Sequence, residues 1–289
     1  MNNREISLNT PWHGNLTAYD VENVIKGEFA RLADMDTSLQ REINALSISQ
    51  LEENPTLLCG SSHVMITFHR SKGIDMATHE VTDGDNSLLA VPWWEWKNHE
   101  MIGNVADGVL IIPDAGEPLI VAPTGSDSLK WSWQPGIGDR KKYTDINSAF
   151  RDMDGESNTA LILDPTDKNA YGLFGENEEQ WRNYAAGYCG EYEFGSLGKG
   201  KWWLPSLGEL NLIRKYLYEI NLALSIMAGG KEITMGNHWT STEAAISSAW
   251  SFNPYTGFTH GGYKCTPQTD YYVRPVTALD LSQISCAEY

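Results

Sequence analysis

The residues best suited to bind a metal ion or to act as a nucleophile are seven histidines and four cysteines. No two histidines have the spacing that places metal ligands on one helix face, and an HExxH motif is absent. The cysteines form no CxxC pair, and neither a GxSxG motif nor a Gly-rich phosphate loop followed by lysine is present. The sequence therefore predicts a protein that is not an enzyme and that has no catalytic residues, no metal site and no cofactor.

Two acidic segments and a group of tryptophans are further candidates for binding. Residues 152–155 (Asp-Met-Asp-Gly) and 164–167 (Asp-Pro-Thr-Asp) are similar to calcium loops, but neither completes the ligand set, so both are interpreted as turns. Trp93, Trp94 and Trp96 could stack on a sugar ring. The interpretation that the sequence favours is a buried cluster that anchors a small β-rich segment.

The formal net charge of −17 bears on the classes of partner. A nucleic-acid-binding protein gains affinity from lysine and arginine, so we expect no nucleic acid partner, and an anionic membrane surface is disfavoured in the same way. No apolar run approaches the roughly 20 residues that span a bilayer, so no membrane insertion is expected. The polar N-terminus lacks the apolar core of a signal peptide, which predicts a protein made in the cytoplasm.

Residues 19–53 carry a heptad pattern that predicts a helix with one apolar seam. The seam positions are Ile25, Phe29, Leu32, Leu39, Ile43 and Leu46, with Asp36 at the remaining position. Such a seam is typical of helices that pair with copies of themselves, which predicts a homo-oligomer, for example a trimer. An amphipathic helix packed on its own domain is the alternative.

Apolar runs and turn residues predict the elements that follow. Strands are expected at residues 63–68, 109–112 and 119–121, and a helix at 178–188. A clearer helix begins at Ser206. Ser206 and Glu209 form a capping box there, and a stripe of apolar residues follows at steps of three and four: Leu210, Ile213, Leu217, Ile220 and Leu224.

An ordered set of short motifs occupies the C-terminal third. Residues 201–210 are KWWLPSLGEL, residues 237–243 are NHWTSTE, and an Ala-Trp pair follows at 249–250. Lys264 and the closing segment YVRPV at 272–276 complete the set. The set resembles the lectin-like domain of the formylglycine-generating-enzyme branch of the C-type lectin fold. More narrowly, it resembles the variable proteins of diversity-generating retroelements, with the clear match over about residues 200 to 279.

The resemblance implies an α+β fold in three parts. A helical segment for oligomerisation or attachment would occupy residues 1–55, and a small β-rich segment would occupy residues 56–105. A C-type-lectin-like ligand-binding domain would follow over residues 106–289, with its variable region at about residues 237–272. Within it we expect Trp239 and Trp250 to be buried, and Glu243, Lys264 and Arg274 to make fixed polar bonds.

In variable proteins of this kind, asparagine codons of the AAY type are diversified, and such codons cannot become Lys, Glu, Gln, Met or Trp. Every residue from Ser251 to Tyr263 is of a reachable type. We therefore predict one contiguous exposed ligand-binding face. It consists of His238, Ala244, Ile246, Ser251, Tyr255, Thr256, Phe258, His260, Gly261, Gly262, Tyr263 and Thr266. A plain β-rich end of a lectin-like domain, without diversification, is the alternative.

The function that these expectations favour is a non-catalytic receptor-binding protein of a phage tail. It would reside in the virion and bind a protein or glycan on the bacterial cell surface. The first alternative is a bacterial surface adhesin with the same fold, located at the bacterial cell surface. The second is an enzyme of the formylglycine-generating type, for which Cys265 and Cys286 lie in the expected half of the chain but in no supporting local pattern.

Overall fold

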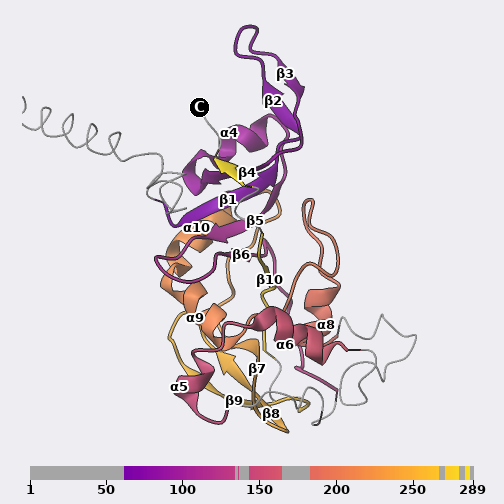
Figure 1. Cartoon of the computed structure of the whole chain (residues 1–289), viewed down its shortest axis with the longest axis vertical. Helices are drawn as coiled ribbons and strands as arrows, with labels where there is room; N and C mark the ends of the chain where they lie inside the picture. Colours follow the sequence, from indigo (N-terminus) through magenta and orange to yellow (C-terminus); the bar gives the residue numbers. More distant parts are fainter. Residues whose placement is uncertain are drawn as a thin grey trace, which may run out of the picture. The chain divides into compact units, whose positions relative to one another are not determined.

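The chain mixes helices and sheets in the residues that the structure, a computed structural model, describes. These are residues 62–133, 136, 143–164, 183–266, 271–279 and 284–286. They hold six α-helices and three sheets, which confirms the α+β class (Figure 1). The helix predicted for residues 19–53, and the self-association expected from it, lie outside the described residues.

The largest sheet has six strands in the order β10-β6-β5-β1-β4-β11. Their bounds are β1 (Val64–His69), β4 (Leu88–Pro92), β5 (Ala106–Ile111), β6 (Leu119–Val121), β10 (Val276–Thr277) and β11 (Ser285–Cys286). Neighbouring strands are antiparallel, except that β11 runs parallel to β4. The strands predicted at 63–68, 109–112 and 119–121 are thus confirmed as β1, β5 and β6.

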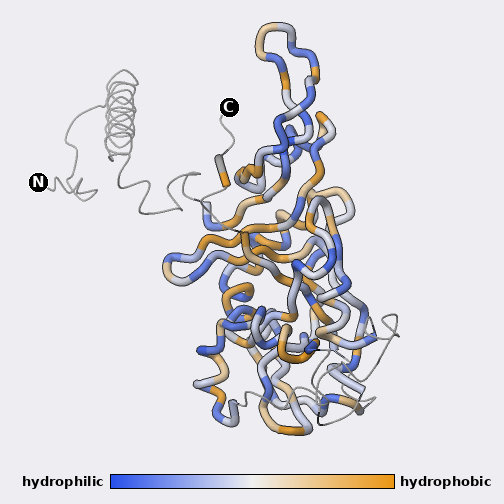
Figure 2. Tube along the Cα trace, turned by 45° about the vertical axis from the view of Figure 1, so that its right-hand side comes forward, coloured by the Kyte–Doolittle hydropathy of each residue, from blue (hydrophilic) through white to orange (hydrophobic). Residues whose placement is uncertain are grey.

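Both faces of this sheet are buried. On one face, Val64, Ile66 and Phe68 of β1 belong to the same core cluster as the apolar side chains of α9 (Leu207–Lys215) and α10 (Leu217–Ile226). On the other face, Met65 packs in a cluster with Tyr192 and Trp202. Successive side chains of a strand point to opposite faces, so burial on both faces requires strands that are apolar throughout. Figure 2 shows such hydrophobic segments running through the sheet.

Strands from before and after residue 105 share this sheet. Val64 of β1 lies opposite Ile111 of β5, and Phe68 of β1 lies opposite Leu89 of β4. The expected β-rich segment over residues 56–105 therefore contributes central strands to the same sheet as the residues that follow it. Within that segment, the hairpin of β2 (Lys72–Ile74) and β3 (Val81–Asp83) forms a sheet of its own (Figure 1).

The three neighbouring tryptophans lie in a short 3-10 helix, η1 (Trp93–Glu95), and in α4 (Trp96–Met101). Trp96 is fully buried, and the centre of its ring lies 5.3 Å from that of Phe68. Trp93 packs against the same core, whereas Trp94 is 55% exposed. The interpretation of this cluster as a buried anchor is confirmed for Trp96, whereas Trp93 is only half-buried.

The capping box predicted at the start of α9 is present. Ser206 Oγ accepts a hydrogen bond from the Glu209 backbone N–H, and Glu209 Oε2 accepts one from the Ser206 backbone N–H at 2.7 Å. The helix does not continue to Leu224 as predicted, because the backbone leaves helical geometry at Tyr216 and α10 begins at the next residue. The apolar stripe still faces the core: Leu210, Ile213, Ile220 and Leu224 are buried, and Leu217 is half-buried against them.

A second, three-stranded sheet consists of β7 (His238–Ala245), β8 (Ser248–Phe252) and β9 (Thr259–Tyr263). The described residues between 146 and 190 form three short helices, α5 (Ile146–Ala149), α6 (Gly155–Ile162) and α8 (Ala185–Gly190). The last overlaps the helix predicted at 178–188. α9 contacts β7 and β8, whereas α10 contacts β1 and β5. The two consecutive helices therefore link the three-stranded sheet to the six-stranded one (Figure 1).

The capping-box carboxyl of Glu209 gives the fold a pH dependence. Burial raises the pKa of Glu209 from 4.5 to about 7. Between these values the folded state holds a proton that the unfolded state has lost, so the contribution of Glu209 to the free energy of unfolding falls as the pH rises. We expect the difference in unfolding free energy between wild type and Glu209→Gln to decline by up to about 3 kcal/mol between pH values of about 4.5 and 7, measured by urea unfolding.

Glutamine is the matched replacement because it keeps an oxygen acceptor and cannot titrate in this range. A comparison between variants is needed because His238 acts in the opposite direction. Burial lowers the pKa of His238 from 6.5 to about 3, so its contribution to stability rises with pH. The contribution of His238 is the same in both proteins, so it cancels when the unfolding free energy of Glu209→Gln is subtracted from that of wild type at each pH. A difference that stays constant from a pH of about 4.5 to about 7 would contradict the prediction.

Candidate ligand-binding surface

Three indole rings fix the frame of the three-stranded sheet. The N–H of Trp239 donates to the Leu129 carbonyl, that of Trp131 to the Thr240 carbonyl, and that of Trp250 to the Tyr143 carbonyl, each at 2.8 Å. These bonds join segments that are distant in the sequence. Trp239 is fully buried, as predicted.

Trp250 is only half-buried, so the prediction of its full burial is wrong. The physical reason lies in its neighbour across the sheet. Trp250 of β8 is paired with Gly261 of β9, which has no side chain to cover the indole ring. Its ring packs against the main core on the other side.

A buried ion pair lies beneath the sheet. Glu243 in β7 is 4% exposed and accepts a hydrogen bond from Lys264 Nζ, which is fully buried. The same ammonium group lies 4.5 Å from the centre of the Trp131 ring, within the range of a cation–π contact. Glu243 and Lys264 are the only Asp, Glu, Lys or Arg residues between positions 238 and 266. Residues 238–266 therefore place no formally charged side chain on the surface of this sheet.

Nine of the twelve predicted contact residues are exposed or partly exposed, and eight of them, all except Tyr255, form a set around strand β9. Phe258 is 59% exposed, Tyr263 is 61% exposed and Ile246 is 53% exposed. The complete set, which we call the β9 surface, is Ala244, Ile246, Thr256, Phe258, His260, Gly261, Tyr263 and Thr266. Apolar side chains at this level of exposure are suited to contact a ligand.

Three predicted contact residues are buried, so their assignment to an exposed face is wrong. The His238 ring packs beside the Tyr272 ring, and its Nδ1 lies 3.2 Å from the Gly236 carbonyl oxygen. Ser251 donates its hydroxyl proton to the His260 carbonyl at 3.1 Å. Gly262 lies directly over the Trp239 ring, where even a methyl group would be 2.7 Å from a ring carbon.

Tyr255 belongs to the frame of the domain more than to its surface. Its hydroxyl donates to the Ile233 carbonyl at 2.7 Å and accepts a hydrogen bond from Asn221 Nδ2 at 3.0 Å. The ring packs against the main core. Replacing Tyr255 by alanine would therefore remove two hydrogen bonds and contacts with the core.

The β9 surface lies on both sides of strand β9 and not on one contiguous face. Neighbouring residues of a strand point to opposite sides, so Gly261 and Tyr263 face one side and His260 faces the other. A Cβ on Gly261 would lie 3.7 Å from the Ala244 side chain, which places Ala244 on the first side. The Phe258 ring packs against the His260 ring at a tilt of 32° with centres 5.2 Å apart, which places it near the second side.

A row of aromatic rings connects the exposed Phe258 to the core. From Phe258 it passes to His260, then to Tyr271 with ring centres 5.7 Å apart, and then to Trp239 with centres 4.6 Å apart. His260 Nε2 and the Tyr271 hydroxyl are hydrogen-bonded at 2.9 Å. Tyr271 was not predicted as part of the site, since residue spacing alone does not show which ring contacts His260.

The motif residues of the C-terminal third form an internal hydrogen-bond network. The carboxylate of Asp152 accepts hydrogen bonds from Asn158 Nδ2 at 2.9 Å and Thr242 Oγ1 at 2.7 Å. Thr242 Oγ1 in turn accepts from the Leu207 backbone N–H, and Ser206 Oγ donates to the Asp152 carbonyl. The carboxylate of Asp152 thus makes its hydrogen bonds to side chains of the interior.

One cluster of catalytic residue types was not predicted. Ser196 Oγ lies 2.6 Å from both His69 Nδ1 and Asp107 Oδ1, and Asp107 Oδ2 lies 2.7 Å from the same His69 nitrogen. A serine nucleophile relay needs the serine and the carboxylate at opposite ring nitrogens. Here both bind Nδ1, and the cluster instead ties the segment around Ser196 to β1 and β5.

The described residues also bear on metal binding and on membrane spanning. Among them, no group of three or more His, Cys, Asp or Glu side chains is arranged to hold a metal ion. Their helices include none that combines the length and the apolar character needed to span a bilayer.

Comparison with known proteins gives a distant structural likeness. No protein-family model matches the chain, and no curated protein matches it. The fold is similar to a crystal structure of a fimbrial protein from Bacteroides ovatus, with a TM-score of 0.37 and 13% sequence identity. The match covers 56% of this chain and 35% of the fimbrial protein, so the chain spans less than half of that protein's length. A likeness of this size carries no argument about function.

The adjacent glycines of β9 provide a matched pair of variants. A Cβ at Gly262 would collide with Trp239 at 2.7 Å and with Tyr271 at 2.9 Å, whereas a Cβ at Gly261 would meet nothing closer than 3.7 Å. We expect Gly262→Ala to lower the free energy of unfolding by about 1–3 kcal/mol and Gly261→Ala to change it by less than about 0.5 kcal/mol. Urea unfolding measures both, and equal effects would show that the ring does not lie beneath Gly262.

The buried ion pair gives a second prediction. Lys264→Met would leave the Glu243 carboxylate buried without its ammonium partner, at an expected loss of about 3–5 kcal/mol of unfolding free energy. Replacing both residues by methionine removes the uncompensated charge, so the double variant should lose much less than the single variant. Unfolding of the two variants in urea provides the measurement, and a double variant that is less stable than Lys264→Met would contradict it.

Proposed function

We propose that this chain is a non-catalytic ligand-binding protein that contacts its target through the β9 surface. The observation that carries the proposal is the combination of exposed aromatic and aliphatic side chains with a rigid support. Phe258 and Tyr263 are more than half exposed at the two sides of β9, and the strand is supported by the buried Trp239. Rigid aromatic side chains bury a large area at low entropic cost, which is why they dominate binding hot spots.

The proposal includes a C-type-lectin-like fold of the kind found in variable proteins of diversity-generating retroelements. Burial supports it in part. Trp239, Glu243 and Lys264, which the diversification of asparagine codons cannot produce, are buried in the frame. The exposed Phe258, Tyr263 and Ile246 are of types that it can produce. A variable site needs such a separation, because changing its side chains must leave the backbone in place.

Within this proposal the chain acts as a receptor-binding protein of a phage tail, with a bacterial surface protein or glycan as the target. The absence of formal charge in residues 238–266 apart from the buried pair indicates how binding would depend on conditions. Salt screens exposed charges and leaves apolar contacts almost unaffected, so the contacts made by Phe258 and Tyr263 should vary little with ionic strength.

The gene neighbourhood tests the diversification part of the proposal. A reverse-transcriptase gene nearby, together with a near-copy of the 3′ end that differs at adenines, would support it. A neighbourhood without either would contradict diversification and leave the binding surface itself as a separate question.

Cell binding tests the surface directly. We expect the fluorescently labelled full chain to bind some members of a panel of bacterial species, measured by flow cytometry. Phe258→Ala with Tyr263→Ala should weaken that binding by a factor of about 30 or more, because an aromatic anchor contributes about 2 kcal/mol. The single variants show which side of β9 carries the contact.

The matched control is Met101→Ala with Tyr218→Ala, since both residues are exposed, at 83% and 76%, and lie outside the β9 surface. Both double variants should melt within a few degrees of wild type, because exposed substitutions change stability by about 0.5 kcal/mol or less. Equal loss of binding in both, or full binding by the Phe258 and Tyr263 variant, would contradict the proposal.

A further inference from the structure

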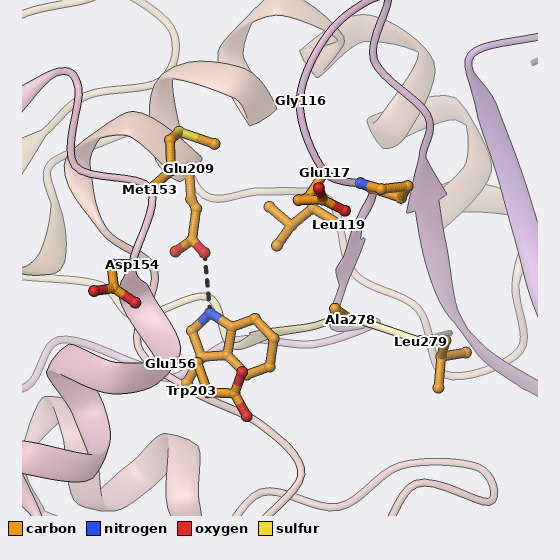
Figure 3. A pocket seen from close by; sticks show the side chains of 11 residues that line it. Gly116, Glu117, Leu119, Met153, Asp154, Glu156, Trp203, Glu209, Ala278 and Leu279 are labelled. Carbon is orange, nitrogen blue, oxygen red and sulfur yellow. Dashed lines mark hydrogen bonds between the residues drawn. The ribbon is translucent and has the colours of Figure 1, made fainter. Parts of the chain in front are cut away.

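A separate hollow lies on the side of the domain where α6, α9 and the β5–β6 connection meet. Its volume of about 600 Å³ is within the range of small-molecule sites (Figure 3). The lining residues are Gly116, Glu117, Pro118, Leu119, Met153, Asp154, Glu156, Trp203, Glu209, Ala278 and Leu279. None of them belongs to the β9 surface, so the inference below does not depend on the proposed function.

Much of the wall of this hollow is apolar and fixed in place. Trp203 is 8% exposed, and its indole N–H donates to Glu209 Oε1 at 3.3 Å, the bond drawn as a dashed line in Figure 3. Glu209 is itself held by the capping box at the start of α9. Leu119, Met153 and Leu279 add further apolar surface. The indole ring is therefore a preformed part of the wall, and binding need not order it.

The polar side chains of the hollow share one sign of charge. Glu117, Asp154 and Glu156 are exposed carboxylates at its wall, whereas burial raises the pKa of the Glu209 carboxyl beside the indole ring to about 7. The lining residues include no lysine, arginine or histidine. Lys215 lines the neighbouring hollow that shares Glu117, but its ammonium group is paired with Asp114 at 2.8 Å. Lys201 lines the neighbouring hollow that shares Glu156.

The chemistry of the wall selects among cations. A divalent metal ion needs six or more oxygen ligands at short range, whereas no metal-binding group of side chains occurs among the described residues. An organic ammonium ion matches both parts of the wall, because its charge is stabilised by carboxylates and by an indole ring, and its carbon atoms by apolar side chains. We propose that this hollow binds a small organic ammonium ion, with Trp203 as the aromatic wall and Glu117 and Glu156 as the nearby counter-charges.

Choline is the probe, and 3,3-dimethylbutan-1-ol is its uncharged control of nearly the same shape. Binding of each to the full chain is followed by ligand-observed NMR titration. We expect saturable binding of choline and at most weak binding of the neutral alcohol. Glu117→Gln with Glu156→Gln should raise the dissociation constant of choline by about fivefold, since each exposed charge contact is worth roughly 0.5 kcal/mol.

The control pair is Glu193→Gln with Glu219→Gln, which changes the net charge equally at exposed positions outside the hollow. This control pair should leave choline binding unchanged. Melting temperatures show whether each double variant is folded. Where a double variant melts at a clearly lower temperature than wild type, its two single variants are measured in its place. No saturable choline binding, equal binding of the neutral alcohol, or equal weakening by both pairs would overturn the proposal. Weakening by the Glu117 and Glu156 pair alone supports it.

Discussion

The buried pair of Glu243 and Lys264 is the interaction on which the three-stranded sheet depends. Each charge alone would be costly to remove from water, and the cost is offset only when the two groups meet in good geometry. Glu243 lies in β7 and Lys264 directly follows β9, so their contact requires both outer strands to take their places around β8. The contact of Lys264 with Trp131 adds a segment from outside the sheet to the same constraint.

This constraint also shapes the surface above it. Because the two formal charges of residues 238–266 are paired inside, the exposed positions present aromatic, aliphatic and small polar side chains. The network around Asp152 extends the support to the rest of the fold, since Thr242 of β7 binds both the Asp152 carboxylate and the first N–H of α9. α9 contacts α10, and α10 contacts the six-stranded sheet. The elements that support the β9 surface are therefore connected to the main core.

Local sequence signals predicted the helices and strands well where a single side chain or a regular spacing of apolar residues determines the structure. The capping box of Ser206 and Glu209 and the apolar strands β1, β5 and β6 were predicted because short-range hydrogen bonds and periodicity determine them. The break at Tyr216 was not, because the stripe of buried residues continues across it in register. The sharing of one sheet by strands on both sides of residue 105 depends on pairing between distant segments, for which spacing gives no signal.

The candidate site shows the same division between local and distant causes. Residue type could indicate that Phe258 and Tyr263 are suited to contact a ligand, but it could not place them on opposite sides of β9, which depends on strand register. Gly261 and Gly262 are identical in sequence terms and opposite in structure, because Gly262 lies against Trp239 whereas Gly261 has room for a side chain. The side chain at position 261 can therefore change without disturbing this frame, whereas the side chain at position 262 cannot. The row of aromatic rings from Phe258 to Trp239 connects the exposed edge of the sheet to the rigid core.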